Sequence, residues 1–305
     1  DEFVSDFVFT ALQAGAVYER DYYLATALSR PLIAKGLVKT ARRERAGYIA
    51  HGCTGKGNDQ VRFEVTARAL APELEILAPV REWELKTRGE EIDFAKKYRI
   101  PIDVTKKKPY SIDVNLWGIS IESGKLEDPY FEPPEDIYQL TAAVNDAPRR
   151  QEYVEIGFAK GQPVSLNGKR LSGVKLVLAL QERAGRHGVG RSDLIENRLV
   201  GIKSREIYEA PAGVVLYKAH QALEALVLDR EVLHYKELIA AKYAEQIYYG
   251  LWYTPLREAL DGFVKRTQRT IFGTVRVKLH KGTCTVVGRR SPHSLYRKEL
   301  ATYEK

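Results

Sequence analysis

A glycine-rich segment between an apolar strand-like run and an amphipathic helical pattern constrains this chain more than any other feature. The segment AHGCTGKGNDQVRFE occupies residues 50–64 and combines three glycines with Lys56, Asn58 and Arg62. Glycine lets the backbone adopt positive φ and approach a ligand closely. The first turn of the following helix offers unpaired N–H groups and the positive end of its dipole to an anion. The pattern therefore predicts a loop that holds a polar, anionic small molecule.

Two common nucleotide-binding motifs do not fit this segment. A P-loop has four residues between its first glycine and a Gly-Lys pair that precedes Ser or Thr. Here Gly52 and Gly55 are too close together, and Gly57 follows Lys56. The dinucleotide motif G-x-G-x-x-G does not match either. Spacing alone leaves open a simple strand-to-helix connection with a solvated lysine, whereas the number of polar side chains in the span favours a binding loop.

The run HGCTGKGNDQVRFE at 51–64 resembles the signature of the argininosuccinate synthase family, ATP-dependent ligases that join citrulline to aspartate. Other runs resemble blocks of the same family in the same order. They are YYLATALSRPLIAK at 22–35, KPYSIDVN at 108–115, RHGVGR at 186–191, IENRLVGIKSREIY at 195–208, YYGLWYTP at 248–255 and SPHSLY at 291–296. The resemblance covers essentially all 305 residues.

Strand and helix patterns alternate in the first third of the chain, which predicts a parallel α/β sheet. The resemblance implies a Rossmann-like nucleotide-binding domain of the adenine-nucleotide alpha-hydrolase type, present in part over residues 1–105. An α+β synthetase and multimerisation domain is expected over residues 106–305, after a Lys-rich, Pro-bounded stretch at 105–109. The elements predicted before this boundary are helices at 2–15, 22–45, 58–70 and 89–98, a buried strand at 48–50, another strand at 74–77, and an extended segment at 100–104.

The second half shows mixed helix and strand patterns. Asn167-Gly168 between two apolar runs is a strong hairpin signal. The predicted strands are 153–158, 163–166, 193–200, 274–279 and 284–287, the helices are 173–184, 213–228, 231–248 and 256–267, and a loop is expected at 127–134.

The resemblance implies a two-step reaction in which the protein acts by positioning substrates. The citrulline ureido oxygen attacks the α-phosphate of ATP and releases pyrophosphate, and the aspartate amine then displaces AMP. No catalytic side chain is assigned, because holding three ligands in line and stabilising phosphate charge suffices. Gly52 is expected to approach ATP through its backbone. Thr54, Asn58 and Asp59 are expected to bind aspartate.

The resemblance assigns the citrulline site to residues from both halves of the chain. Zwitterionic citrulline needs a cationic and an anionic partner, which Arg62 and Glu196 provide. The blander alternatives are a surface ion pair between Arg62 and Asp59 and a solvated Glu196. The expected citrulline-binding residues are Tyr22, Asn58, Arg62, Ser111, Ser120, Glu196 and Tyr208.

Charge and composition narrow the class of partner. The chain has 48 Lys and Arg against 40 Asp and Glu, a formal net charge of +8. A basic balance suits nucleic acid and also anionic small substrates. The basic residues are dispersed, without an arginine-glycine tract or zinc-knuckle spacing, so runs such as 35–45 are interpreted as solvated surface. No nucleic-acid partner is expected, and no membrane partner, because no apolar run approaches the roughly 18 residues of a membrane helix.

Cysteine and histidine usage favours a cytoplasmic protein without a structural metal. Cys53 and Cys284 are too few for a disulfide framework, which fits a reducing compartment. Cys53 is interpreted as a packing residue of the loop. The six histidines show no metal-ligand spacing. Magnesium is therefore expected only as the complex of ATP with Mg²⁺.

The resemblance also suggests that the chain is a piece of a longer protein. The family opens with a loop of Ser-Gly-Gly-Leu-Asp-Thr-Ser type that grips pyrophosphate, and no such loop precedes Asp1. The family tail that assembles a homotetramer would follow Lys305. Two alternatives stay open: a substrate-binding fragment that does not turn over, and a related pyrophosphatase-loop enzyme acting on tRNA, which would call for an RNA-binding appendage or a catalytic cysteine pair.

Overall fold

The structure is a computed structural model, and it describes residues 1–85, 87–102 and 110–302. The domain boundary predicted at 105–109 lies outside the described residues. The division of the chain into residues 1–105 and 106–305 therefore stays a prediction.

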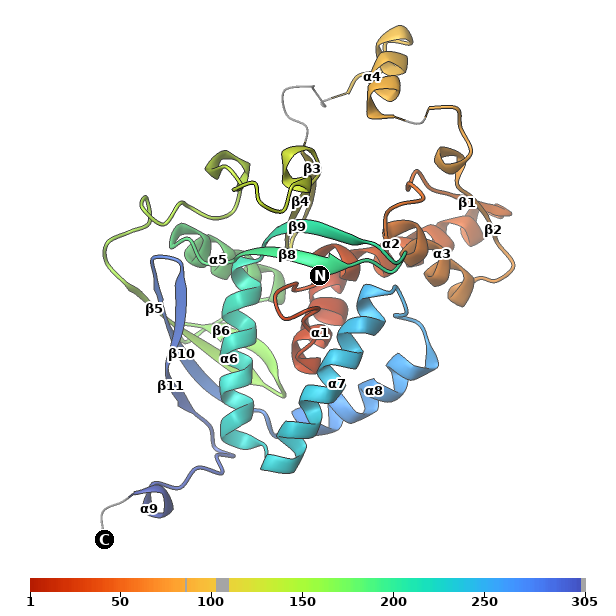
Figure 1. The fold of residues 1–305 in the computed structure, drawn as a ribbon. Coiled ribbons are helices and arrows are strands. Elements are labelled where there is room, and N and C mark those ends of the chain that lie inside the picture. The colour runs from red at the N-terminus through yellow and green to blue at the C-terminus, as the bar shows by residue number, and fades with distance from the viewer. Residues whose placement is uncertain (86, 103–109, 303–305) are drawn as a thin grey trace.

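The N-terminal segment packs into the core of the C-terminal half. A π-helical turn, η1 (Phe3–Val8), runs directly into α1 (Phe9–Ala14), which ends at Gly15 with φ 72°. Residues of both turns share one hydrophobic cluster with residues between 154 and 284. Figure 1 shows α1 at the centre of the molecule, with elements of the second half around it. The predicted helix over the first 15 residues is confirmed.

Residues 25–77 form a small α/β unit with its own core. The strands pair in parallel, with Ile49 opposite Ile76, and the two long helices pack against each other. The predicted parallel arrangement is thus confirmed, although this sheet has only two strands in the described residues. The elements are α2 (Ala25–Glu44), β1 (Tyr48–Ala50), α3 (Asp59–Leu70) and β2 (Glu75–Leu77), followed by η2 (Pro79–Arg81) and α4 (Arg88–Lys97).

Three details of this unit differ from the predictions. Helix α2 starts at Ala25 and not at residue 22, because Leu24 adopts a left-handed conformation with φ 62°. Strand β1 was expected to be buried, but only its central residue Ile49 is, since little structure covers this two-stranded sheet. Residues 100–102 form no strand, and 103–104 lie outside the described residues.

A four-stranded antiparallel sheet in the order β3-β4-β9-β8 faces this α/β unit. The strand predicted over 193–200 is confirmed in part, because β8 starts two residues earlier and ends at Asn197. The other three strands were not predicted. The bounds are β3 (Ser111–Asn115), β4 (Gly118–Glu122), β8 (Arg191–Asn197) and β9 (Lys203–Glu209), with short 3₁₀ turns η3 (Gly124–Glu127) and η4 (Glu135–Ile137) after β4.

A second antiparallel sheet, in the order β11-β10-β5-β6-β7, carries the two predicted hairpins. Asn167 and Gly168 adopt φ 49° and 77°, the left-handed pair that a two-residue hairpin turn needs. Val275, Val277 and Leu279 on its inner face are fully buried. The strands are β5 (Glu152–Ala159), β6 (Gln162–Leu166), β7 (Lys169–Arg170), β10 (Gly273–His280) and β11 (Thr283–Arg290).

Long helices cover the inner face of this sheet and connect it to the N-terminal segment (Figure 1). The predicted helices of this half are all confirmed, with small shifts at their ends. They are α5 (Gly173–Arg186), α6 (Pro211–Val227), α7 (Arg230–Tyr248) and α8 (Pro255–Thr267), followed by η5 (Gln268–Thr270) and, near the C-terminus, α9 (Lys298–Ala301). Within the described residues, none of the helices is long and apolar enough to cross a membrane.

Candidate active site

A polar cavity of about 330 Å³ lies where the glycine-rich loop meets one face of the β3-β4-β9-β8 sheet. The N-terminal turn of α2 contributes another wall. Figure 1 shows the connected ends of β8 and β9 reaching toward α2 and α3. The fold brings every sequence-predicted binding residue to this cavity, namely Gly52, Thr54, Asn58, Asp59, Arg62, Tyr22, Ser111, Ser120, Glu196 and Tyr208.

Each strand of the sheet contributes cavity residues at alternate positions, and for β8 this alternation extends to Arg198, the residue directly after the strand. Successive side chains of a strand point to opposite faces, so residues two apart share a face. Applied to each predicted site residue, this two-residue period identifies a second cavity residue that the sequence analysis missed. The pairs are Ser111 with Asp113, Ser120 with Glu122, Glu196 with Arg198, and Tyr208 with Glu206.

Glu196 is a buried carboxylate held by two tyrosines. Tyr208 Oη donates to its Oε2 at 2.7 Å, and Tyr248 Oη donates to its Oε1 at 2.6 Å. Glu196 is only 3% exposed, so the alternative of a solvated glutamate is wrong. Burial raises its pKa, and the two tyrosine hydrogen bonds and the charge of Arg62 oppose this rise without cancelling it. The site thus holds a desolvated anion suited to an ammonium group.

Arg62 is buried at the base of α3 and remains a cation. Its Nη1 lies 3.0 Å from Asp59 Oδ1, its Nε donates to the carbonyl of Tyr248 at 2.9 Å, and its guanidinium sits 4.9 Å from the Tyr248 ring centre. The sequence analysis left open a surface ion pair between Arg62 and Asp59. The ion pair exists, but Arg62 is 4% exposed and is therefore not on the surface. Burial lowers its pKa, yet the charges around it raise the pKa overall.

Asp59 receives a second guanidinium from Arg30, a residue that the sequence analysis did not single out. Arg30 Nη2 lies 2.7 Å from Asp59 Oδ2 and 2.5 Å from Asp113 Oδ2. Burial raises the pKa of Asp59, but the charge of Arg62 and the hydrogen bonds from Arg30 outweigh it and leave this pKa lowered. Arg30 follows Thr26 by four residues in the helix predicted at 22–45. Residues with this spacing share one face of a helix, so the sequence could have indicated both as site residues.

Asn58 connects the loop to two distant parts of the chain. Its Nδ2 donates to Tyr248 Oη at 2.8 Å, and its Oδ1 accepts from the backbone N–H of Leu199 at 3.0 Å. It occupies the N-cap position of α3 but makes no side-chain capping bond there. The N–H groups of the first turn of α3 are therefore not capped by the Asn58 side chain.

Tyr22 and the serines line the opposite wall. The Tyr22 ring stacks on Tyr208 with centres 4.1 Å apart, and its Oη accepts from the N–H of Ala27 at 3.2 Å. Ser120 Oγ lies 3.4 Å from Thr26 Oγ1. Burial raises the pKa of Tyr22 and of Tyr208, so both hydroxyls stay neutral hydrogen-bonding groups.

The loop itself is fixed by local contacts. Cys53 N–H donates to His51 Nδ1 at 3.2 Å, and Gln60 donates to the carbonyl of Gly55 at 2.6 Å. Cys53 was interpreted as a packing residue, but it lines the cavity and is partly exposed. Burial raises the pKa of its thiol, which keeps it protonated and unreactive near neutral pH.

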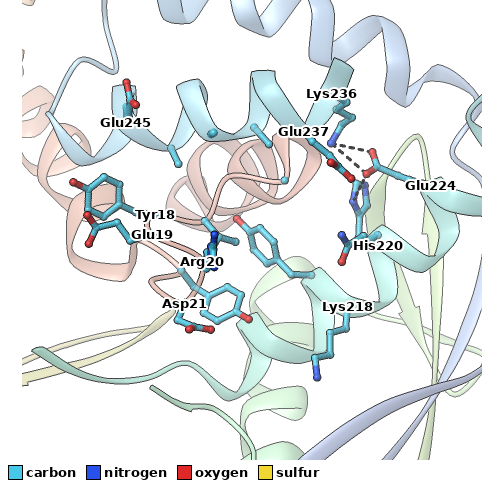
Figure 2. A pocket seen from close by; sticks show the side chains of 18 of the residues that line it. Tyr18, Glu19, Arg20, Asp21, Lys218, His220, Glu224, Lys236, Glu237 and Glu245 are labelled. Atoms are coloured by element: carbon cyan, nitrogen blue, oxygen red, sulfur yellow. Dashed lines mark hydrogen bonds and ion pairs between the residues drawn. The ribbon is translucent and has the colours of Figure 1, made fainter. Parts of the chain in front are cut away.

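A larger cavity of about 820 Å³ lies behind the tyrosine wall, between residues 15–21 and helices α6 and α7. Figure 2 shows its floor, where Lys236 pairs with Glu224 at 3.1 Å beside His220. It is separated from the polar cavity by Tyr18, whose ring stacks 3.7 Å from Tyr248. None of the predicted binding residues lines it, so the smaller cavity is the candidate active site.

No group of three or more potential metal ligands occurs among the residues that the structure describes. The cavity carries Arg30, Arg62 and Arg198 among its lining residues, together with five carboxylates. Such a surface can bind carboxylates, phosphates and ammonium groups by charge-assisted hydrogen bonds. A divalent cation would need oxygen ligands from a bound phosphate in addition to those of the protein.

Comparison with known proteins identifies relatives along the whole chain. Residues 1–101 match the family described as arginosuccinate synthase N-terminal HUP domain, and residues 110–305 match the arginosuccinate synthase C-terminal domain. The argininosuccinate synthase of Carboxydothermus hydrogenoformans is 58% identical over 303 residues, covering 99% of this chain and 76% of the relative. The enzyme of Gloeobacter violaceus is 60% identical over 303 residues with the same coverage. That of Symbiobacterium thermophilum is 59% identical over 304 residues, covering 100% of this chain and 76% of the relative.

Proposed function

This chain belongs to the argininosuccinate synthase family, and we propose that its polar cavity binds citrulline, aspartate and the phosphate end of ATP. The family's enzymes are ATP-dependent ligases. The observation that supports this assignment most is that the loop, helix α3 and the four-stranded sheet meet at one cavity. This cavity is lined by both arginines and carboxylates, which suit the charged groups of the proposed substrates.

Citrulline would lie between the cation and the anion of the cavity. Glu196, fixed by two tyrosine hydroxyls, would accept the α-ammonium group, and Arg62 would pair with the α-carboxylate. Ser111 and Ser120 would supply hydroxyls along the sheet, and Tyr22 would pack against the chain of the substrate. Hydrogen bonds hold Glu196, and stacking on Tyr208 holds Tyr22, before any substrate binds, which lowers the entropic cost of orienting the ureido oxygen toward a phosphate.

Aspartate would bind at the loop, where Thr54, Asn58 and Asp59 lie. Asp59 would hold the ammonium group of aspartate by charge. Its lowered pKa makes it a weak base, so we assign it an orienting role and no proton abstraction. Deprotonation of the amine is then left to solvent or to a phosphate oxygen.

ATP would approach the backbone of Gly52 and the N-terminus of α3. Gly52 has only the side chain of Val80 near the position of a Cβ, at 3.8 Å, so the backbone is accessible. The ureido carbon is a poor electrophile because its nitrogens donate electrons into it. Adenylation activates this carbon by converting the ureido oxygen into part of a leaving group. Magnesium would enter with the ATP phosphates, as its preference for phosphate oxygens suggests.

We also propose a cytoplasmic homotetramer. Both cysteines are free thiols, which suits a reducing compartment. Leu295, Tyr296 and Leu300 near the C-terminus are 59%, 64% and 82% exposed. Large apolar side chains exposed together favour an interface with another subunit.

The test measures pyrophosphate release by the full-length protein with ATP, citrulline and aspartate. Arg62→Ala and Asp59→Ala are each expected to lower kcat/KM by about 100-fold, because each removes the charged group that is proposed to pair with a substrate and breaks the partly buried ion pair between them. Arg68→Ala, on the exposed face of the same helix, is the control and should retain activity. Normal turnover of both site variants would refute the site assignment.

A further inference from the structure

Arg198 sits at the end of β8 and gathers groups from two neighbouring strands. Its Nη2 lies 2.5 Å from Glu122 Oε2 of β4 and 2.6 Å from Glu206 Oε1 of β9, and its Nε donates to Ser204 Oγ at 2.6 Å. Its side chain is 15% exposed. One guanidinium therefore ties the strand ends that form the sheet side of the cavity.

The residues directly after β8 also contact the glycine-rich loop. Arg198 Nη1 points to the carbonyl of Lys56 at 3.4 Å, a long hydrogen bond. The next residue, Leu199, donates its backbone N–H to Asn58 Oδ1 at 3.0 Å. Two consecutive residues of the second half thus contact the loop at a backbone carbonyl and at a side chain that lines the cavity.

The end of β8 is also fixed from behind, on the side of the larger cavity. Tyr18 Oη donates to the carbonyl of Asn197 at 2.8 Å, and Glu19 Oε2 accepts from its N–H at 3.2 Å. Figure 2 shows Tyr18 and Glu19 side by side on this wall. Because β8 cannot move freely, the contacts of Arg198 and Leu199 transmit the position of the sheet to the loop.

Arg198 is also the cation that contacts the carboxyl groups of Glu122 and Glu206. Burial, followed by the charges of Glu122 and Glu196, raises the pKa of Glu206. Burial lowers the pKa of Arg198, but the hydrogen bond and charge of Glu206 and the charge of Glu122 raise it overall, so the guanidinium stays charged. Loss of this guanidinium would leave the side chains of Glu122 and Glu206 without their shared hydrogen-bond donor and loosen the link between β4 and β9.

We propose that Arg198 is a positioning residue that couples the glycine-rich loop to the sheet, so that aspartate at the loop and citrulline at the sheet strengthen each other's binding. This proposal rests on the proposed function for the identity of the two ligands. Coupling between sites is reciprocal, so either ligand can report it. Arg198 itself would act through the loop and need not touch either substrate.

The experiment measures the citrulline Kd by calorimetry with and without saturating aspartate, in the full-length protein. Wild-type protein is expected to bind citrulline at least about fivefold more tightly with aspartate present. Arg198→Met should abolish this difference, and Arg198→Lys should restore part of it, because lysine keeps the charge and loses the planar fork.

Arg205→Met is the matched control. Arg205 lies on the same hairpin, pairs with Asp193 at 2.6 Å and donates to the carbonyls of Asp128 and Phe131, none of which belongs to the loop. Its loss should lower thermal stability and leave the coupling unchanged. Equal coupling in wild type and Arg198→Met, or equal loss in both variants, would overturn the proposal while the proposed function stands.

A second measurement needs no substrate. Hydrogen exchange of the amides at residues 52–58 should be faster in Arg198→Met than in Arg205→Met, because only the first loses the clamp on the loop. Equal exchange in the two variants would overturn the proposal. Failure of wild-type protein to bind either amino acid, with the exchange difference present, would instead refute the proposed function.

Discussion

Tyr248 donates a hydrogen bond of 2.6 Å to Glu196 across 52 residues of sequence. The same hydroxyl accepts from Asn58 at 2.8 Å. One phenol therefore connects the end of α7 with strand β8 and with the start of α3. Because β8 and the start of α3 both carry cavity residues, Tyr248 sets how far the loop stands from the buried carboxylate.

Removing this hydroxyl should weaken citrulline binding. Tyr248→Phe deletes a hydrogen bond to a buried carboxylate, which contributes about 1.5–3 kcal/mol, so the citrulline Kd should rise by at least about tenfold. Tyr235→Phe, on the exposed side of the same helix, should bind as wild type does. Calorimetric titration of both variants checks this, and an unchanged Kd for Tyr248→Phe would contradict it.

Arg30 should control the pH range over which aspartate binds. Asp59 must be ionised to attract an ammonium group, and its lowered pKa keeps it ionised in mildly acidic solution. Arg30→Met removes one of the two guanidiniums that cause this shift, so the pKa rises and aspartate affinity should be lost at a higher pH than in wild type.

The measurement for this prediction is the aspartate Kd as a function of pH. Near neutral pH we expect about a tenfold weaker Kd from the lost hydrogen bonds to Asp59. Arg42→Met is the control, because Arg42 pairs with exposed Glu73 on the outer side of α2 at 2.9 Å. Superimposable pH profiles for Arg30→Met and wild type would show that Arg30 does not tune Asp59.

Glu206 should make stability fall as pH rises. Burial raises its pKa from 4.5 to about 9, so between these values the folded state binds a proton that the unfolded state has released. The free energy of unfolding therefore decreases with pH across this window, and the slope vanishes below it, where both states are protonated. Glu206→Gln removes the titrating group.

Thermal unfolding from pH 5 to pH 9 provides the check. The decrease in Tm should be smaller for Glu206→Gln than for wild type, since the amide is neutral at every pH. Parallel Tm curves for the two proteins would mean that Glu206 holds no proton in the folded state. Glu155→Gln, on the exposed side of the other sheet, is a suitable control.

Gly250 is required for the placement of Arg62. It adopts φ 76°, and a Cβ there would lie 2.6 Å from the Cα of Arg62. Gly250→Ala should cost about 2 kcal/mol or more of stability and displace Arg62 from the cavity. Gly36→Ala and Gly262→Ala place a methyl group in open helical positions and should be neutral or slightly stabilising. Denaturant unfolding of the three variants tests this order.

The local parts of the fold could be predicted from the sequence. The turn at Asn167-Gly168 follows from the backbone freedom of these residues, and helix α7 follows from its apolar period. Strands β3, β4 and β9 were not predicted, although β3 and β4 alternate polar and apolar residues as half-buried strands do. In β3 the apolar Ile112 and Val114 are 41% and 57% exposed, which reverses the usual inward pattern.

The sequence by itself determined the family resemblance, the position of the glycine-rich loop and the residue types of the candidate site. Only the tertiary structure decided their partners: that Arg62 is buried between Asp59 and Tyr248, and that Arg198 joins the sheet to the loop. Local periodicity reports which side of an element is covered. It does not report which charges meet in the interior, because those contacts join positions far apart in the chain, and burial then sets their pKa and their chemistry.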